Sequence, residues 1–198
     1  MEIRDGQVEG RLVDPRTTAL IVIDVQNGFI NQHSRGVVPA IVRLVKQWRD
    51  AGAPIVFARF HNALGSPYER ITGWTKLRTA REQALVSELT MYAATAAGVI
   101  DKAQSSVFTE EGVQLIRESG WSDLVLCGMD TDSCVYDSAV AAYQSGLRPW
   151  IVTDACASTG GSQYHDAALL LAARNVSPRQ LVTSQDVLNQ LGRQGTCA

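Results

Sequence analysis

The chain has 198 residues, of which 45% are hydrophobic and 19% are charged, and this length and mixture are typical of a single globular domain spanning residues 1–198. Its formal net charge is −2 and it has no basic cluster, which argues against nucleic acid and anionic membranes as partners. No apolar run approaches the length of a membrane span, and the charged stretch from Met1 to Arg11 does not resemble a signal peptide, so we expect the chain in the cytoplasm.

Short apolar runs alternate with longer segments of helical periodicity. The first run, from Ala19 to Val25, is nearly continuous and rich in β-branched residues, as expected of a strand buried on both faces. Strands are predicted at 19–25, 54–60, 99–100, 123–127, 150–153 and 180–183. Helices are predicted at 38–48, 109–119, 133–145, 164–174 and 184–191. This βαβ series predicts a three-layer αβα sandwich around a six-stranded open parallel sheet.

Residues 62–80 depart from this alternation. The segment contains Gly65, Pro67, Tyr68, Gly73 and Trp74 and has little periodicity. A long irregular connection in a compact domain is usually either a lid over a binding site or a contact between subunits. The sequence favours neither of these two interpretations.

The chain contains four cysteines, Cys127, Cys134, Cys156 and Cys197. No Cys-x-x-Cys pair occurs, so their spacing does not resemble a zinc site. We expect reduced thiols, with Cys127 in a strand core and Cys197 in a terminal tail.

Three residues with complementary chemistry follow three separate predicted strands. Asp24 interrupts the first apolar run, where an unpaired charge would be costly, Lys102 follows the third strand, and Cys134 lies just inside the helix after the fourth. In open α/β sheets, ligands bind beyond the carboxyl ends of the strands. A carboxylate can accept a thiol proton, a lysine can stabilise a thiolate, and a helix N-terminus lowers a thiol pKa. A plainer interpretation makes the aspartate a turn former and the lysine a solvated side chain.

Other side chains near these strand ends are candidates for binding substrate. Phe29 and Trp74, together with Phe60 and Tyr68, could line an apolar pocket, and Arg59 or His61 could hold a polar or anionic group. The three histidines show no paired ligand spacing, so we expect no metal and no cofactor.

Three segments resemble the signatures of the isochorismatase-like cysteine hydrolases, a superfamily that includes nicotinamidase, N-carbamoylsarcosine amidase, ureidoacrylate amidohydrolase and isochorismatase. The resemblance spans roughly residues 18–183. Its motifs are Leu20-Ile21-Val22-Ile23-Asp24-Val25-Gln26-Asn27, Asp101-Lys102 with Ser106-Val107-Phe108, and Cys127-Gly128-Met129-Asp130-Thr131-Asp132-Ser133-Cys134-Val135.

The resemblance implies a Rossmann-like topology and a catalytic triad of Asp24 as proton acceptor, Lys102 as electrostatic partner and Cys134 as nucleophile. It also implies a cis peptide between Met129 and Asp130, with the N–H groups of Asp130 and Cys134 forming an oxyanion hole.

The sequence departs from the family pattern at three places. Asp130 stands where the family usually has Ala or Thr, and Gly28 stands where an Asp is common. The run from Arg59 to Asn62 lacks the Asp-x-His pattern with which nicotinamidases bind metal.

The leading functional hypothesis is an amidase that cleaves a C–N bond of a small amide, ureide or carbamoyl compound. One alternative is an isochorismatase-type hydrolase of a vinyl ether, which does not need the cysteine. A second is a non-catalytic binding protein on the same fold. We expect a small-molecule substrate and a homodimer or homotetramer.

Overall fold

The computed structural model describes residues 14–192. Six strands form one sheet in the order β3-β2-β1-β4-β5-β6, and every neighbouring pair is parallel. The strands are β1 (Thr18–Ile23), β2 (Ile55–Phe60), β3 (Gly98–Lys102), β4 (Asp123–Met129), β5 (Arg148–Ala157) and β6 (Leu181–Val182). The predicted open parallel sheet is confirmed.

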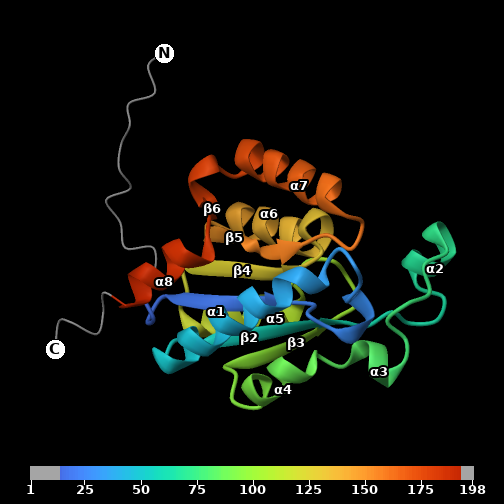
Figure 1. The fold of residues 1–198 in the computed structure, drawn as a ribbon, viewed down its shortest axis with the longest axis horizontal. Helices are drawn as coiled ribbons and strands as arrows, with labels where there is room; N and C mark the ends of the chain where they lie inside the picture. Colours follow the sequence, from blue (N-terminus) through green and yellow to red (C-terminus); the bar gives the residue numbers. More distant parts are fainter. Residues whose placement is uncertain (1–13, 193–198) are drawn as a thin grey trace.

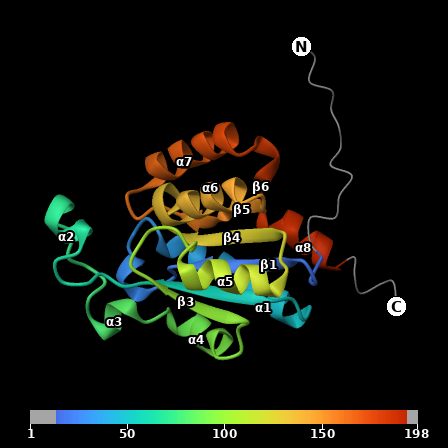
Figure 2. The same ribbon diagram turned by 180° about the vertical axis from the view of Figure 1, so that it is seen from behind.

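Helices cover both faces of this sheet (Figures 1 and 2). On one face α1 packs against α4 and α8, while on the other α6 packs against α7 and α5 contacts β3. The main helices are α1 (Val38–Asp50), α4 (Ser87–Ala93), α5 (Glu110–Ser119), α6 (Tyr136–Gln144), α7 (Ser162–Asn175) and α8 (Ser184–Gly192). No described helix is both long enough and apolar enough to cross a membrane.

The order of the strands reverses between β1 and β4. The chain leaves β1 toward β2 and β3 and then crosses back to β4, so the two central strands feed connections that run in opposite directions. At such a switch point the loops at the carboxyl ends diverge and leave room for a ligand. β1 and β4 are completely buried along their length, as their continuous apolar runs predict.

The two central strands also approach each other unusually closely. Gly128 on β4 pairs with Ile23 on β1 and has a φ of 121°. A Cβ placed at Gly128 would lie 2.0 Å from the Ile23 carbonyl oxygen, so only glycine fits.

Some element boundaries differ from the sequence-based prediction. β5 extends to Ala157, beyond the predicted end at Thr153, because its polar Asp154 accepts hydrogen bonds from the Ser184 N–H and hydroxyl, both at 2.6 Å. α7 begins at Ser162 rather than Tyr164. Both differences arise where an element ends in polar residues, because a prediction from apolar periodicity does not include them.

The segment 62–80 contains a helix that its sequence did not reveal. α2 (Pro67–Thr72) begins at the N-cap Ser66, whose hydroxyl accepts the Glu69 N–H at 3.2 Å, and ends at Gly73 in the left-handed region. A second short helix, α3 (Ala80–Gln83), closes the segment. α2 extends away from the rest of the fold in both ribbon views. Six residues are too few to show a helical period, which is why the prediction was an irregular loop.

Candidate active site

Asp24, Lys102 and Cys134 lie together at the carboxyl edge of the sheet. Asp24 directly follows β1, Lys102 is the last residue of β3, and Cys134 lies in a π-helical turn, Thr131–Val135, between β4 and α6. Asp24 and Lys102 are far apart in the sequence, yet the Lys102 ammonium donates to the Asp24 carboxylate at 2.7 Å. The fold therefore brings the three predicted residues to one place.

The ion pair between Asp24 and Lys102 is fully enclosed. Both side chains have 0% exposure, and the Lys102 ammonium also donates to the Gln104 carbonyl at 3.2 Å. Asp24 Oδ1 has no hydrogen-bond partner among the described residues. Asp24 also has a φ of 52°, in the left-handed region. A strained backbone and an unsatisfied buried carboxylate oxygen are costly to the fold, and such costs concentrate at functional sites.

Burial and the neighbouring charges shift the pKa of all three groups. Burial raises the pKa of Asp24, and attraction to Lys102 only partly offsets this rise. Burial disfavours the charged form of Lys102, but the nearby Asp24 and Cys134 outweigh it and raise its pKa. Asp24 is therefore a stronger base than an exposed carboxylate, and Lys102 stays cationic.

The Cys134 thiol differs from the expectation drawn from its position at a helix start. Its pKa is raised, first by burial and then by the negative charge of Asp24, while Lys102 acts in the opposite direction. The sequence suggested a lowered thiol pKa because a helix N-terminus favours thiolate. That effect is smaller here than the cost of placing a second negative charge in a buried site beside Asp24. The resting thiol is protonated, with a proton acceptor beside it.

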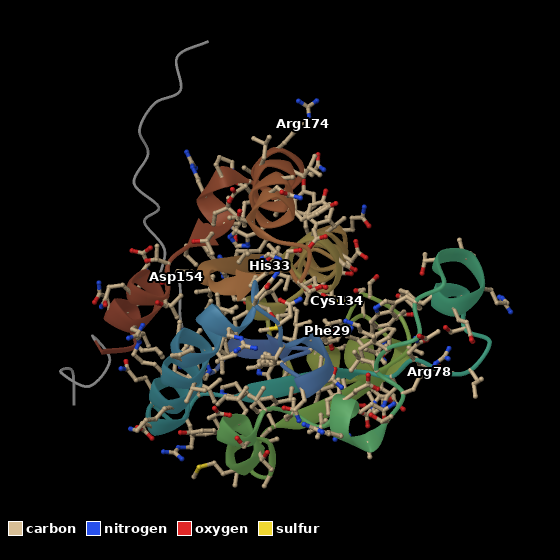
Figure 3. All side chains as sticks on the ribbon, turned by 45° about the vertical axis from the view of Figure 1, so that its right-hand side comes forward. Phe29, His33, Arg78, Cys134, Asp154 and Arg174 are labelled. Atoms are coloured by element: carbon tan, nitrogen blue, oxygen red, sulfur yellow. The ribbon has the colours of Figure 1, made fainter. Side chains whose placement is uncertain are left out.

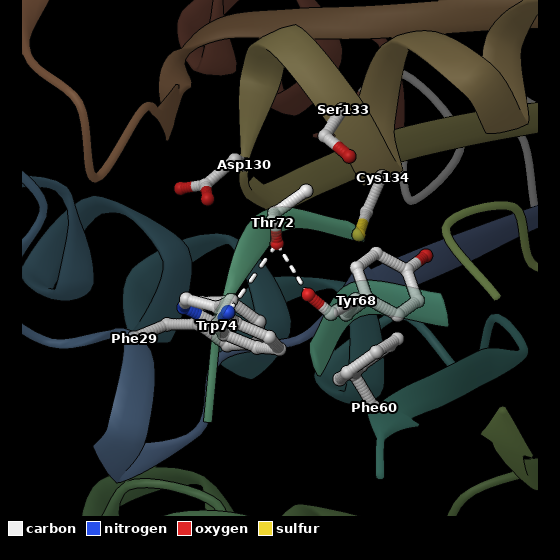
Figure 4. Close-up of a pocket in the computed structure, with 8 residues that line it drawn as sticks. All are labelled: Phe29, Phe60, Tyr68, Thr72, Trp74, Asp130, Ser133 and Cys134. Atoms are coloured by element: carbon white, nitrogen blue, oxygen red, sulfur yellow. Dashed lines mark hydrogen bonds between the residues drawn. The ribbon is translucent and has the colours of Figure 1, made fainter. Parts of the chain in front are cut away.

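A cavity of about 320 Å³ opens above Cys134. Figure 4 shows the Cys134 sulfur and the Asp130 carboxylate on one wall, facing a group of aromatic rings. Figure 3 places Phe29 near Cys134 within the whole molecule. The described lining consists of four aromatic residues, Phe29, Phe60, Tyr68 and Trp74, and of Thr72, Asp130, Ser133 and Cys134.

The four aromatic residues form one contact group, which we call the aromatic cluster. Phe29 and Trp74 are stacked with centroids 6.1 Å apart, and Phe60 meets Tyr68 edge to face at 5.0 Å. Tyr68 and Trp74 come from the segment 62–80, so this segment forms part of the cavity wall. Whether it also contacts another subunit stays a prediction.

Asn62 links the beginning of this segment to its end. Its side-chain amide donates to the Trp74 and Lys76 carbonyls at 3.1 and 3.0 Å, and its oxygen accepts the Ser66 hydroxyl at 2.5 Å. Asn62 is 3% exposed, so these bonds are shielded from water. The part of the cavity wall that carries Trp74 is thereby fixed by hydrogen bonds at Ser66, before α2, and at Trp74 and Lys76, after it.

Arg59 and His61 do not line this cavity. Both contact Asp101: the Arg59 guanidinium binds its carboxylate through two bonds of 2.7 Å, and His61 Nε2 lies 2.8 Å from Asp101 Oδ1. Side chains alternate between the faces of a strand, so Arg59 and Asp101 share one face of the β2–β3 pair while Phe60 and Lys102 share the other. The contact of these two residues with substrate, expected from the sequence, stays a prediction.

Asp130 is anchored beside the nucleophile. Thr159 donates its backbone N–H to Oδ1 at 2.6 Å and its hydroxyl to Oδ2 at 2.8 Å. The peptide bond between Met129 and Asp130 is cis. Burial raises the pKa of Asp130 from 3.8 to about 6, although the two bonds from Thr159 act in the opposite direction.

Sequence reasoning missed the role of Gln26 in shaping this site. Its fully buried amide donates to the Phe60 and Gln83 carbonyls at 3.1 and 2.7 Å and accepts the Phe60 N–H at 2.7 Å. Gln26 thus ties the end of β1 to β2 and to α3. Thr72 and Ser133, which line the cavity, were also missed, because nothing in their sequence positions distinguishes them from surface residues.

Of the three cysteines in the described part of the chain, Cys134 lines the cavity and Cys127 and Cys156 do not. Cys127 and Cys156 are buried and form no disulfide in the described part of the chain, and Cys197 lies outside it. Between residues 14 and 192, no three His, Cys, Asp or Glu side chains gather in a way that could hold a metal ion. The absence of a metal stays a prediction.

Comparison with known proteins identifies relatives along nearly the whole chain. The sequence model of the isochorismatase domain matches residues 18–183. A maleamate amidohydrolase from Pseudomonas putida is 27% identical, over 89% of this chain and 87% of its own length. The crystal structure of a nicotinamidase from Bacillus subtilis is 25% identical with a TM-score of 0.73, covering 84% of this chain and 99% of its own. A cysteine hydrolase structure from Pseudomonas syringae has a TM-score of 0.82 at 16% identity, covers 96% and 99% of the two chains, and so shows a shared fold.

Proposed function

The chain belongs to the isochorismatase family, and we propose that it is a cysteine hydrolase that cleaves a C–N bond of a small amide, ureide or carbamoyl compound. The observation that carries the proposal is the enclosed Asp24–Lys102 ion pair, with its 2.7 Å bond, beside the cavity-lining thiol of Cys134. The relatives named for maleamate and nicotinamide hydrolysis support the same class of reaction.

In the first step of the proposed reaction, the Cys134 thiol gives its proton to Asp24 as its sulfur attacks the substrate. The raised pKa of the thiol means that deprotonation accompanies attack, and the raised pKa of Asp24 makes the carboxylate a competent acceptor. The sulfur adds to the substrate carbonyl carbon, and the C=O electron pair moves to oxygen. Lys102 stabilises the negative charge carried by Asp24 and then by the thiolate.

The tetrahedral intermediate collapses to an acyl-thioester. In this proposal the N–H groups of Asp130 and Cys134 stabilise the oxyanion, and the protonated Asp24 gives its proton to the departing nitrogen. Asp24 then takes a proton from water, which attacks the thioester carbonyl and releases a carboxylic acid and the free thiol. Each proton removed by Asp24 is returned, so the enzyme ends as it began.

An activity screen on small primary amides and ureides tests the proposal. Wild type should release ammonia from at least one compound, and Cys134→Ala should release none. Cys156→Ala is the matched control, because it removes another buried thiol that does not line the cavity. Intact-protein mass spectrometry during turnover should reveal an acyl adduct on Cys134.

Three outcomes would contradict the proposal. Full amide hydrolysis by Cys134→Ala would exclude the covalent mechanism. Hydrolysis of vinyl ethers, undiminished in Cys134→Ala and without any amide turnover, would favour the isochorismatase-type reaction. A wild type that binds small molecules and converts none of them would favour a binding protein.

A further inference from the structure

Asp130 is the charged residue among the eight that line the cavity in the described part of the chain. It is partly buried and lies on the same wall as the Cys134 sulfur, opposite the aromatic cluster (Figure 4). Its two bonds come from the N–H and the hydroxyl of Thr159, both of which are uncharged donors. The cavity thus contains a carboxylate that no cation of the described residues neutralises.

The basic side chains near the site already have carboxylate partners. Lys102 is bound to Asp24, and Arg59 and His61 are bound to Asp101. The two charged side chains that add to the rise in the pKa of Asp130 are Asp132 and Asp24, and both are carboxylates. A partly buried carboxylate without a cationic partner is costly, and a cation that enters the site relieves that cost.

The carboxylate also keeps the capacity to bind a ligand. Each carboxylate oxygen can accept two hydrogen bonds, and Thr159 uses one position on each. With a pKa of about 6, the group is mostly ionised at neutral pH. The opposite wall consists of aromatic rings, and aromatic rings attract ammonium groups, as the Lys102 ammonium 5.2 Å from the centre of the Phe60 ring illustrates.

We infer that Asp130 determines specificity, and that the substrate is a small amide carrying a positively charged amino group. This inference rests on the proposed amidase function. In the bound substrate, the amide carbonyl would lie at Cys134 and the ammonium between Asp130 and the aromatic cluster. The same cavity repels amides that carry a carboxylate, such as the maleamate for which one relative is named.

Binding to a catalytically silent protein tests the inference separately from the reaction. In Cys134→Ala, calorimetry compares three benzamides that carry aminomethyl, ethyl or carboxyl groups at the meta position. We expect the cationic compound to bind at least about tenfold more tightly than the neutral one, and the anionic compound most weakly. Adding Asp130→Asn should bring the cationic-to-neutral ratio close to one.

Asp132→Asn is the matched control. It removes the same charge two residues away, from an exposed side chain that does not line the cavity, so the cationic preference should persist. Equal affinity for the cationic and neutral amides, no measurable binding of the cationic amide, or a preference that survives Asp130→Asn would each overturn the inference. Preferential binding without any amide hydrolysis by wild type would support the specificity and refute the proposed reaction.

Discussion

Asp130 places a measurable pH dependence in the stability of the fold. Its carboxyl group has a pKa of 3.8 when exposed and about 6 in the folded protein, chiefly because burial disfavours the charged form. Between these two values the folded protein holds more protons on Asp130 than the unfolded chain does. The free energy of unfolding therefore falls as the pH rises through this range.

The size of the effect follows from the difference in pKa. The difference corresponds to about 3 kcal/mol, which is absent below about pH 4 and complete above about pH 6. Asp130→Asn removes the titrating group. The stability of the variant relative to wild type should therefore increase by about 1.4 kcal/mol between about pH 5 and about pH 7.5.

Urea unfolding followed by tryptophan fluorescence measures this difference at the two pH values. The comparison cancels any constant packing cost of asparagine, because such a cost is the same at both. Asp132→Asn is the control, since this exposed residue should give nearly the same difference at both values. A difference between Asp130→Asn and wild type that stays constant, or shrinks toward pH 7.5, would refute the argument that burial governs this carboxyl.

Three further predictions concern the proposed reaction. Cys134→Ala, Asp24→Asn and Lys102→Ala should each remove most turnover in folded protein, and double variants should be hardly slower, because the residues act as a unit; additive losses measured by steady-state kinetics would contradict this. Iodoacetamide should modify Cys134 before the other described cysteines, since its sulfur lines the cavity, and faster at alkaline pH, since its pKa is raised; peptide mapping across a pH series decides this, and earlier labelling of Cys127 would count against it. Purified protein should contain no stoichiometric transition metal and should keep its activity after chelator treatment, which elemental analysis and rate measurements would check; a tightly bound metal would require a different mechanism.

Two of the three proposed catalytic residues are marked locally, whereas Lys102 was identified from its place after a predicted strand and from the family resemblance. Asp24 interrupts an apolar run, and Cys134 follows an apolar run that ends in Gly128. Continuous β-branched runs also predicted the buried central strands, since a strand covered on both faces has no polar side to display. The identity and order of these segments determined the parallel sheet and the edge at which a ligand binds.

Only the tertiary structure decided how these residues behave. The direction of the Cys134 pKa shift depends on burial and on the carboxylate of Asp24, which a sequence pattern around one helix start does not contain. The cavity wall from the segment 62–80 depends on hydrogen bonds from Asn62 to Trp74 and Lys76, residues that no local period links.

Arg59 and Asp130 show the same difference between what the sequence indicates and what the folded structure decides. The sequence identified Arg59 as a candidate for substrate contact, but the alternation along β2 and its register with β3 direct it to Asp101. Through the family resemblance, the sequence marked Asp130 as part of the expected cis peptide and oxyanion hole and as a departure from the usual residue. Only the structure shows that its carboxylate is held by Thr159 and that it lines the cavity. Residue type and spacing determine which chemistry is available. Desolvation and long-range contacts determine which groups carry it out, because desolvation and contacts both depend on segments that meet only in the folded chain.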